Sequence, residues 1–347
     1  MIDLNDSSTF KHLDPKNVLR STELFLDQGI QVLEDFKDFT LPAEYSEVEN
    51  IVFSGMGGSA LGAQIVYHLY KNTLSLPFYV NNDYTLPNFA NENTLVILSS
   101  YSGTTEEILA SAQDALKRGC KVTALTTSGA LAEVMSKNNK PFIQFDLRNN
   151  PSNQPRLGSG YTILGTLIIL SASGLLKLDP SEVLEDIYAA KNNFDNSRSN
   201  AIEIAKNIVG YVPVIVASEF LNGCSHVMRN QINECSKSLA FNFPIPELNH
   251  HLMEGLKNPQ DKKLKFIFIE SNLYSEKNTK RMNITKDVVN KNKILYVSYA
   301  PRSTSNISQA LETVSFGGLL SFYLAILYGI DPSPIPWVDY FKEKLKS

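Results

Sequence analysis

The fold is decided by the stretch Val96-Ile97-Leu98-Ser99-Ser100-Tyr101-Ser102-Gly103-Thr104-Thr105-Glu106-Glu107. Its apolar beginning is typical of a buried parallel strand, its Ser/Gly/Thr middle is typical of a loop, and residues 108–116 have the pattern of a helix. The free amides and the positive dipole end of a helix N-terminus attract phosphate. We therefore expect an anion site here, completed by the hydroxyls of Ser100, Ser102, Thr104 and Thr105.

A capping box is the alternative interpretation of this loop. Thr104 and Glu107 have the Thr-x-x-Glu spacing that ties down a helix start without any ligand. Capping needs only one hydroxyl, however, and residues 100–105 offer four. Gly103 would also let the backbone approach a ligand closely. These features favour a phosphate site over a simple cap.

The composition is that of a globular chain without a strong charge. The 347 residues are 43% hydrophobic, which provides an ordinary core for one large or two medium domains. A formal net charge of -4 makes nucleic acid a poor candidate partner, so any anion has to be bound locally. The two longest apolar runs, residues 161–176 and 316–330, fall short of the ~20 residues of a membrane span. We expect both to be buried helices and no membrane association.

The cysteines and the N-terminus indicate the compartment. Cys120, Cys224 and Cys235 are an odd number, with no CxxC spacing and no neighbouring histidine pattern of a zinc site. We expect reduced thiols and no metal site. The first residues lack the basic and apolar regions of a signal peptide. The expected localisation is therefore cytoplasmic.

Strand and helix patterns alternate along residues 47–150, after a helical arm that is predicted for residues 1–46. The predicted strands are residues 51–53, 78–80, 95–99, 121–126 and 142–145, with helices at 60–70, 105–118 and 130–137. This alternation predicts an α/β fold, in which a parallel sheet is flanked by helices in a doubly wound, flavodoxin-like arrangement. Ligands of such sheets bind where the carboxyl ends of strands meet helix N-termini.

A weaker copy of this alternation is predicted within residues 151–347. Residues 149–160 are polar and irregular, which makes them the expected domain boundary. Beyond two helices within residues 180–209, strands at 212–217, 265–269 and 294–298 alternate with helices at 222–237, 276–290 and 305–328. The counterpart of the first glycine turn is Ser218-Glu219-Phe220-Leu221-Asn222-Gly223, which contains only one glycine. We therefore expect no tight phosphate site in this lobe and one active site per pair of lobes.

The first glycine turn, residues 54–60, also satisfies the G-x-G-x-x-A fingerprint of dinucleotide-binding folds. Such a fold needs an acidic residue near the end of the second strand, and Asp83 comes late for this role. The rival interpretation is that Gly57, Gly58 and Ser59 give the backbone close access to the phosphate of the 100–105 loop. A dinucleotide fold has no use for that second loop, so we favour a phosphorylated small molecule over NAD.

These two loops together resemble a sugar isomerase (SIS) domain, a feature also shared with regulators and amino-sugar enzymes. Downstream stretches make the resemblance more specific: Pro155-Arg156, Asn230-Gln231-Ile232-Asn233-Glu234, Pro246-Glu247-Leu248-Asn249-His250, and Gly329-Ile330-Asp331-Pro332-Ser333-Pro334 followed by Phe341-Lys342. With them, nearly the whole chain resembles the bifunctional phosphoglucose/phosphomannose isomerase family. The resemblance implies two SIS subdomains in a homodimer, with an active site near the interface that receives a histidine from the neighbouring chain.

The resemblance assigns catalytic roles to a carboxylate and an arginine. It implies that Glu234 is the base that moves a proton between C1 and C2 of the sugar, a task that suits a carboxylate. Arg156 would stabilise negative charge on the enediolate intermediate. Without the resemblance, Glu234 would pass as an exposed glutamate at a helix end, and Arg156 as a loop arginine in a surface ion pair.

Two further roles come from the same resemblance. His250 would open the sugar ring, a task that suits a side chain titrating near neutrality. His251 stands where the family pattern has Asn, so either histidine could face the site. Lys342 would assist ring opening or substrate binding, with Lys344 as the alternative in another register.

The activity implied by the resemblance is that of an isomerase of carbohydrate metabolism, in glycolysis and gluconeogenesis. It would interconvert glucose 6-phosphate, mannose 6-phosphate or both with fructose 6-phosphate through a cis-enediol, without metal or cofactor. The phosphate would be bound by Gly57, Gly58, Ser59, Ser100, Ser102 and Thr105. The alternative is a regulator that binds a sugar phosphate without turnover, since such a sensor needs the phosphate loops but neither Glu234 nor His250.

Overall fold

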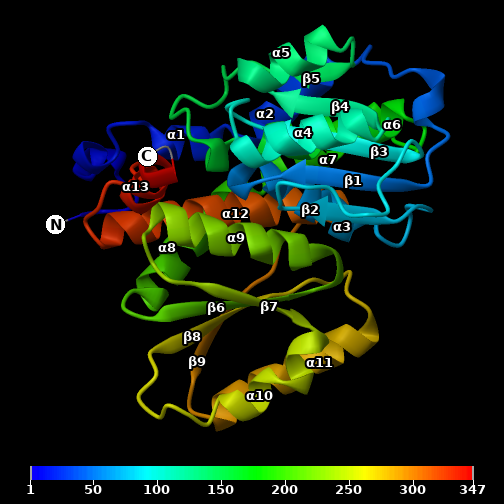
Figure 1. Cartoon of the computed structure of the whole chain (residues 1–347). Coiled ribbons are helices and arrows are strands. Elements are labelled where there is room, and N and C mark those ends of the chain that lie inside the picture. The colour runs from blue at the N-terminus through cyan, green and yellow to red at the C-terminus, as the bar shows by residue number, and fades with distance from the viewer. Residues whose placement is uncertain (1, 346–347) are drawn as a thin grey trace.

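The computed structural model describes residues 2–345 and contains two parallel sheets (Figure 1). The strands of the first sheet are β1 (Asn50–Gly55), β2 (Phe78–Asn81), β3 (Thr94–Ser100), β4 (Lys121–Thr126) and β5 (Phe142–Gln144). Their order is β2-β1-β3-β4-β5, and every pair is parallel. This is the flavodoxin-like order, so the predicted doubly wound α/β class is confirmed.

Helices cover both faces of the first sheet. One face carries α4 (Glu106–Lys117) and α5 (Gly129–Lys137), whereas the other carries α3 (Leu61–Tyr70) and α6 (Ser159–Ala172). Side chains along β1 and β3 alternate between the faces, as the pleat of a strand requires. The α4 side receives Val52, Val96 and Leu98, and the α3 side receives Ile51, Phe53, Leu95 and Ile97.

The second sheet repeats this topology with four strands. They are β6 (Val212–Ser218), β7 (Phe241–Ile245), β8 (Leu264–Ile269) and β9 (Leu295–Tyr299), in the order β7-β6-β8-β9. Strand β7 was not expected from the sequence, because Asn242 and Pro244 both lower strand propensity. Proline is tolerated in this strand because β7 lies at the edge of its sheet.

Three helices pack together on the inner side of the second sheet, between the two sheets. They are α8 (Phe194–Ile208), α9 (Asn222–Cys235) and α12 (Asn306–Leu327), while α10 (Leu252–Gly255) and α11 (Glu276–Lys291) lie on the outer side (Figure 1). By length and composition α12 could cross a membrane, with a mean hydropathy of 1.6, but 94% of its apolar window is buried inside the protein. It is a core helix, as its interrupted apolar run predicted.

The remaining helices lie around this core. The predicted N-terminal arm contains α1 (Val18–Glu23) and α2 (Phe25–Asp35), and α2 packs on α6 and on α7 (Pro180–Asn192). Near the other terminus is α13 (Pro336–Leu345), which has no buried residue. The division into residues 1–46, 47–150 and 151–347 stays a prediction.

Two glycines let the helices between the sheets approach closely. A Cβ on Gly62 of α3 would lie 2.5 Å from the backbone of Thr162 in α6, and one on Gly223 of α9 would lie 2.5 Å from the Gln64 carbonyl of α3. Side chains never come so near to backbone atoms, so a larger residue at either position would force the helices apart. Helix α3 is therefore held between the two lobes.

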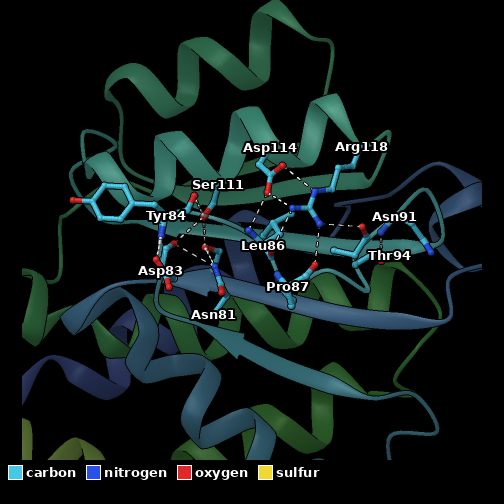
Figure 2. A network of polar contacts seen from close by, with 12 residues as sticks. Asn81, Asp83, Tyr84, Leu86, Pro87, Asn91, Thr94, Ser111, Asp114 and Arg118 are labelled. Atoms are coloured by element: carbon cyan, nitrogen blue, oxygen red, sulfur yellow. Dashed lines mark hydrogen bonds and ion pairs between the residues drawn. The ribbon is translucent and has the colours of Figure 1, made fainter.

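The loop between β2 and β3 fastens α4 to its sheet (Figure 2). Asp114 and Arg118 form an ion pair of 2.7 Å on α4. The Asp114 carboxylate accepts the Leu86 amide at 3.0 Å, and the Arg118 guanidinium donates to the carbonyls of Leu86 at 3.2 Å and Pro87 at 2.9 Å. This network attaches the C-terminal half of α4 to the loop.

We predict that Arg118→Ala lowers the free energy of unfolding by about 1–3 kcal/mol, because it leaves half-buried carbonyls of the loop without a donor. Urea denaturation of the wild type and the variant measures this difference. Lys117→Ala on the exposed side of the same helix is the matched control and should have little effect. Equal stability of all three proteins would contradict the role of the network.

Candidate functional site

Two loops meet at the carboxyl ends of the neighbouring strands β1 and β3. The first begins η4 (Gly57–Ala60), where Gly57 is exposed and has a positive φ of 49°. The second follows β3 and leads into α4. Ser59 joins them, since its carbonyl accepts Ser99 Oγ and its hydroxyl accepts the Tyr101 amide, both at 2.9 Å. In this sheet order β1 and β3 flank the switch point, where ligands bind.

The start of α4 differs from a capping box. Thr105, not Thr104, is the N-cap residue, and no side-chain hydrogen bond caps the helix. The hydroxyls pair with one another instead: Ser100 with Thr105 at 2.8 Å, and Ser102 with Thr104 at 3.0 Å. The capping-box alternative is therefore wrong.

The first amides of α4 are consequently available to a ligand. Within residues 2–345, the N–H groups of Glu106 and Glu107 have no hydrogen-bond acceptor. Together with the helix dipole they favour an anion at this position. The predicted phosphate residues Gly57, Gly58, Ser59, Ser100, Ser102 and Thr105 all belong to these two loops.

Arg156 lies directly behind the first loop. A Cβ on Gly58 would lie 2.9 Å from the Arg156 backbone nitrogen, so only glycine lets η4 pack on η5 (Pro155–Leu157). The Arg156 side chain is 2% exposed and donates to the carbonyls of Pro332 and Ser333, each at 2.8 Å. These acceptors hold the guanidinium in one position.

Glu234 lies beside this arginine, near the C-terminal end of α9. Its Oε2 is 3.8 Å from Arg156 Nη1, and its side chain is 30% exposed. Burial raises the pKa of the Glu234 carboxyl, and the charges of Arg156, Lys237 and Lys342 offset only part of this rise. A carboxylate with a raised pKa next to a fixed positive charge is suited to general acid–base work.

Lys237 supports the end of α9. It has a positive φ of 51°, and its ammonium donates to the carbonyls of Glu234 and Pro332, both at 2.9 Å. It thereby joins the helix end to the same C-terminal segment that holds Arg156. Neither Lys237 nor the acceptor carbonyls were expected, because backbone acceptors leave no mark in the amino-acid pattern.

The two candidate lysines of α13 have different surroundings. Lys342 is near enough to Glu234 for its charge to lower the pKa of that carboxyl, although burial remains the larger effect. Lys344 lies over the Tyr340 ring, 5.7 Å from its centroid. The charge of Lys342 therefore acts on Glu234.

His250 lies at the opposite end of the β7 strand from Glu234. Helix α9 returns the chain to the amino end of β7, where Glu234 lies, whereas His250 ends η7 (Glu247–His250) after the carboxyl end of β7. The five residues of β7 separate these ends by roughly 16 Å. His250 is exposed, and His251 lies 3.8 Å from Glu247. A single chain therefore brings Arg156, Glu234 and Lys342 together but not His250.

The other candidate chemistries find less support. In residues 2–345 there is no group of three or more His, Cys, Asp or Glu side chains that could hold a metal ion. Asp83, the possible ribose ligand of a dinucleotide site, accepts the amide of Tyr84 at 2.7 Å within the loop on α4 (Figure 2). In this structure the Asp83 carboxylate is thus a hydrogen-bond acceptor within the loop.

We predict that Glu234→Gln raises the melting temperature at pH 7 and above. A carboxyl whose folded pKa is raised stabilises the fold below its unfolded pKa, and this contribution is lost as the pH rises through the folded pKa. The neutral amide avoids the cost of ionising there. Thermal melts at pH 4 and pH 8 test this, because the difference should be smaller at pH 4; a lower melting temperature of the variant at pH 8 would contradict it.

Known proteins are similar to this chain over most of its length. Residues 44–140 match the SIS domain, and residues 197–345 match the bacterial phospho-glucose isomerase C-terminal SIS domain. The bifunctional phosphoglucose/phosphomannose isomerase of Caldicellulosiruptor bescii is 30% identical, covering 89% of this chain and 93% of that protein. That of Aquifex aeolicus is 31% identical, covering 86% and 91%.

Solved structures show the same fold at low identity. A hypothetical protein of Thermus thermophilus has a TM-score of 0.73 at 15% identity, covering 94% of this chain and 90% of that one. A putative phosphosugar isomerase of Clostridium difficile has a TM-score of 0.71 at 14% identity, covering 91% and 95%. From its sequence relatives and its two SIS-type lobes, the chain belongs to the bifunctional phosphoglucose/phosphomannose isomerase family.

Proposed function

We propose that this chain is an aldose–ketose isomerase that converts glucose 6-phosphate, mannose 6-phosphate or both to fructose 6-phosphate and back. The observation that carries the proposal is the half-buried Glu234 carboxylate, which lies 3.8 Å from the buried guanidinium of Arg156. The backbone of that arginine packs on Gly58 of the first loop. A sensor of sugar phosphates would need the loops alone. The family relatives named above carry the same activity in their names.

The reaction moves two protons within the substrate, one between carbons and one between oxygens. The Glu234 carboxylate takes the proton from C2 of the open-chain aldose while the C1 carbonyl becomes an enediolate oxygen. It then returns the proton to C1, and the hydroxyl proton of O2 passes to O1, so that C2 becomes the carbonyl and C1 carries a hydroxyl group. Electrons shift only within the substrate, so no redox cofactor is required. A raised pKa suits Glu234 for both directions of transfer, because the group must accept and release the proton with similar ease.

Arg156 and the two loops supply electrostatic stabilisation. A guanidinium fixed by the carbonyls of Pro332 and Ser333 faces the developing enediolate charge without having to reorient, and such donors lower a barrier by several kcal/mol. The phosphate would be bound by the amides at the start of α4 and by Gly57, Gly58, Ser59, Ser100, Ser102 and Thr105. Lys342 would assist binding or ring opening from α13.

Ring opening would require a second subunit. His250 follows the carboxyl end of β7, whereas Glu234 lies near its amino end. We therefore assign the ring-opening step to the partner's His250 in a homodimer. Each site would then contain Glu234 of one protomer and the histidine of the other. We also propose that the enzyme works in the cytoplasm, where the three buried cysteines, which form no disulfide, would stay reduced.

The first test is a coupled assay that detects fructose 6-phosphate, with glucose 6-phosphate and mannose 6-phosphate supplied separately. We predict that Glu234→Gln lowers kcat about 100- to 10,000-fold and leaves substrate affinity nearly unchanged. Glu203→Gln, at an exposed position of α8, is the matched control and should keep wild-type turnover. Retained activity of Glu234→Gln would overturn the base assignment, and binding without any wild-type turnover would favour the regulator.

The subunit arrangement is tested by mixing two inactive variants. Refolded dimers of Glu234→Gln and His250→Ala should regain about a quarter of wild-type activity, because half of the dimers are mixed and each mixed dimer has one intact site. Either variant refolded alone is the control. If the mixture stays inactive, the two residues act within one chain and the shared site is wrong.

A further inference from the structure

The second lobe has its own version of the phosphate loops. In each lobe a central strand is followed by a 3-10 helix whose first residue has a positive φ. Gly57, with a φ of 49°, comes two residues after the end of β1, and Glu219, with a φ of 47°, comes directly after β6. In each lobe the next strand of the sheet, β3 or β8, leads to a helix whose N-cap is a hydroxyl residue, Thr105 or Ser275. Sheet order and backbone thus make Glu219 the counterpart of Gly57.

The Glu219 side chain fills the position that a ligand would occupy. Its Oε1 accepts the Ser275 amide at 2.9 Å, the Ser275 hydroxyl at 2.6 Å and the Asn278 side-chain amide at 2.7 Å. All three donors belong to the first turn of α11, a helix of 16 residues. The carboxylate is therefore bound as an anion at a helix N-terminus.

Two further observations favour an anion at this position. Burial raises the pKa of Glu219, but the hydrogen bonds from Ser275 and Asn278 and the charge of Lys71 more than offset this, so the pKa is lowered. The backbone is also unusual, because a glutamate rarely adopts a left-handed φ. Its three hydrogen bonds hold the side chain in this strained conformation.

The geometry points to Glu219 as an internal anion that occupies the phosphate position of the second lobe and excludes a second sugar phosphate from it. This inference rests on the proposed function for the meaning of the first-lobe site. It explains why two lobes of the same topology form one substrate site: in the first lobe Gly57 leaves the position open, and in the second Glu219 closes it.

The test removes the carboxylate and counts bound inorganic phosphate. Glycine readily adopts a positive φ, so Glu219→Gly should fold without backbone strain. We predict that this variant binds one more phosphate per chain than the wild type in equilibrium dialysis. Asparagine also tolerates the left-handed backbone, and its shorter neutral side chain vacates the position of the Glu219 carboxylate. Glu219→Asn should therefore also bind one more phosphate, and it provides the test if the glycine variant does not fold. Glu219→Gln keeps the position filled and is the control that should gain no phosphate.

The same preparations separate this inference from the proposed function. Glu219→Gly should keep wild-type isomerase turnover, because Glu219 is outside the Glu234 site. If the wild type shows no turnover, the proposed function fails while the phosphate count is still informative. If folded Glu219→Gly and Glu219→Asn bind no more phosphate than the wild type, the internal anion is overturned.

Discussion

The site depends on one buried charge. Arg156 is almost fully buried, and its guanidinium donates hydrogen bonds to backbone carbonyls of the 332–333 segment, while the Glu234 carboxylate lies 3.8 Å away. Because the carbonyl acceptors carry no formal charge, the positive charge of Arg156 is left to act on Glu234. The close packing of η4 on η5, the position of α9 and the C-terminal segment can all be understood as the enclosure of this charge.

The sequence predicted those features that depend on residues close together in the chain. The loop after β3 was identified because a fully apolar strand, a glycine and a helix signal follow one another within a few residues. That Arg156 and Glu234 belong to one site was expected only from the family resemblance, since the two residues are far apart in the chain and no local pattern links them. The supporting acceptors were missed altogether, because a backbone carbonyl is present at every residue.

The errors also have physical causes. The Thr104–Glu107 spacing is right for a capping box, but the helix begins one residue later than that box requires, and the loop hydroxyls pair among themselves. Strand β7 was missed because proline and asparagine reduce its strand signal, while its edge position removes the penalty. The 218–223 turn was recognised as having only one glycine, but the sequence could not indicate what the Glu219 carboxylate binds.

The hydrogen bonds from Arg156 to the 332–333 segment also affect when the protein can complete its folding during synthesis. The guanidinium and the Pro332 carbonyl are 176 residues apart in the chain. At synthesis rates of about 5–20 residues per second, roughly 9–35 s pass between their emergence. The first sheet can form during that time, but Arg156 still lacks two of its acceptors, the carbonyls of Pro332 and Ser333. The guanidinium therefore reaches its final position only in a late step, when both lobes have been translated and the 332–333 segment closes over it.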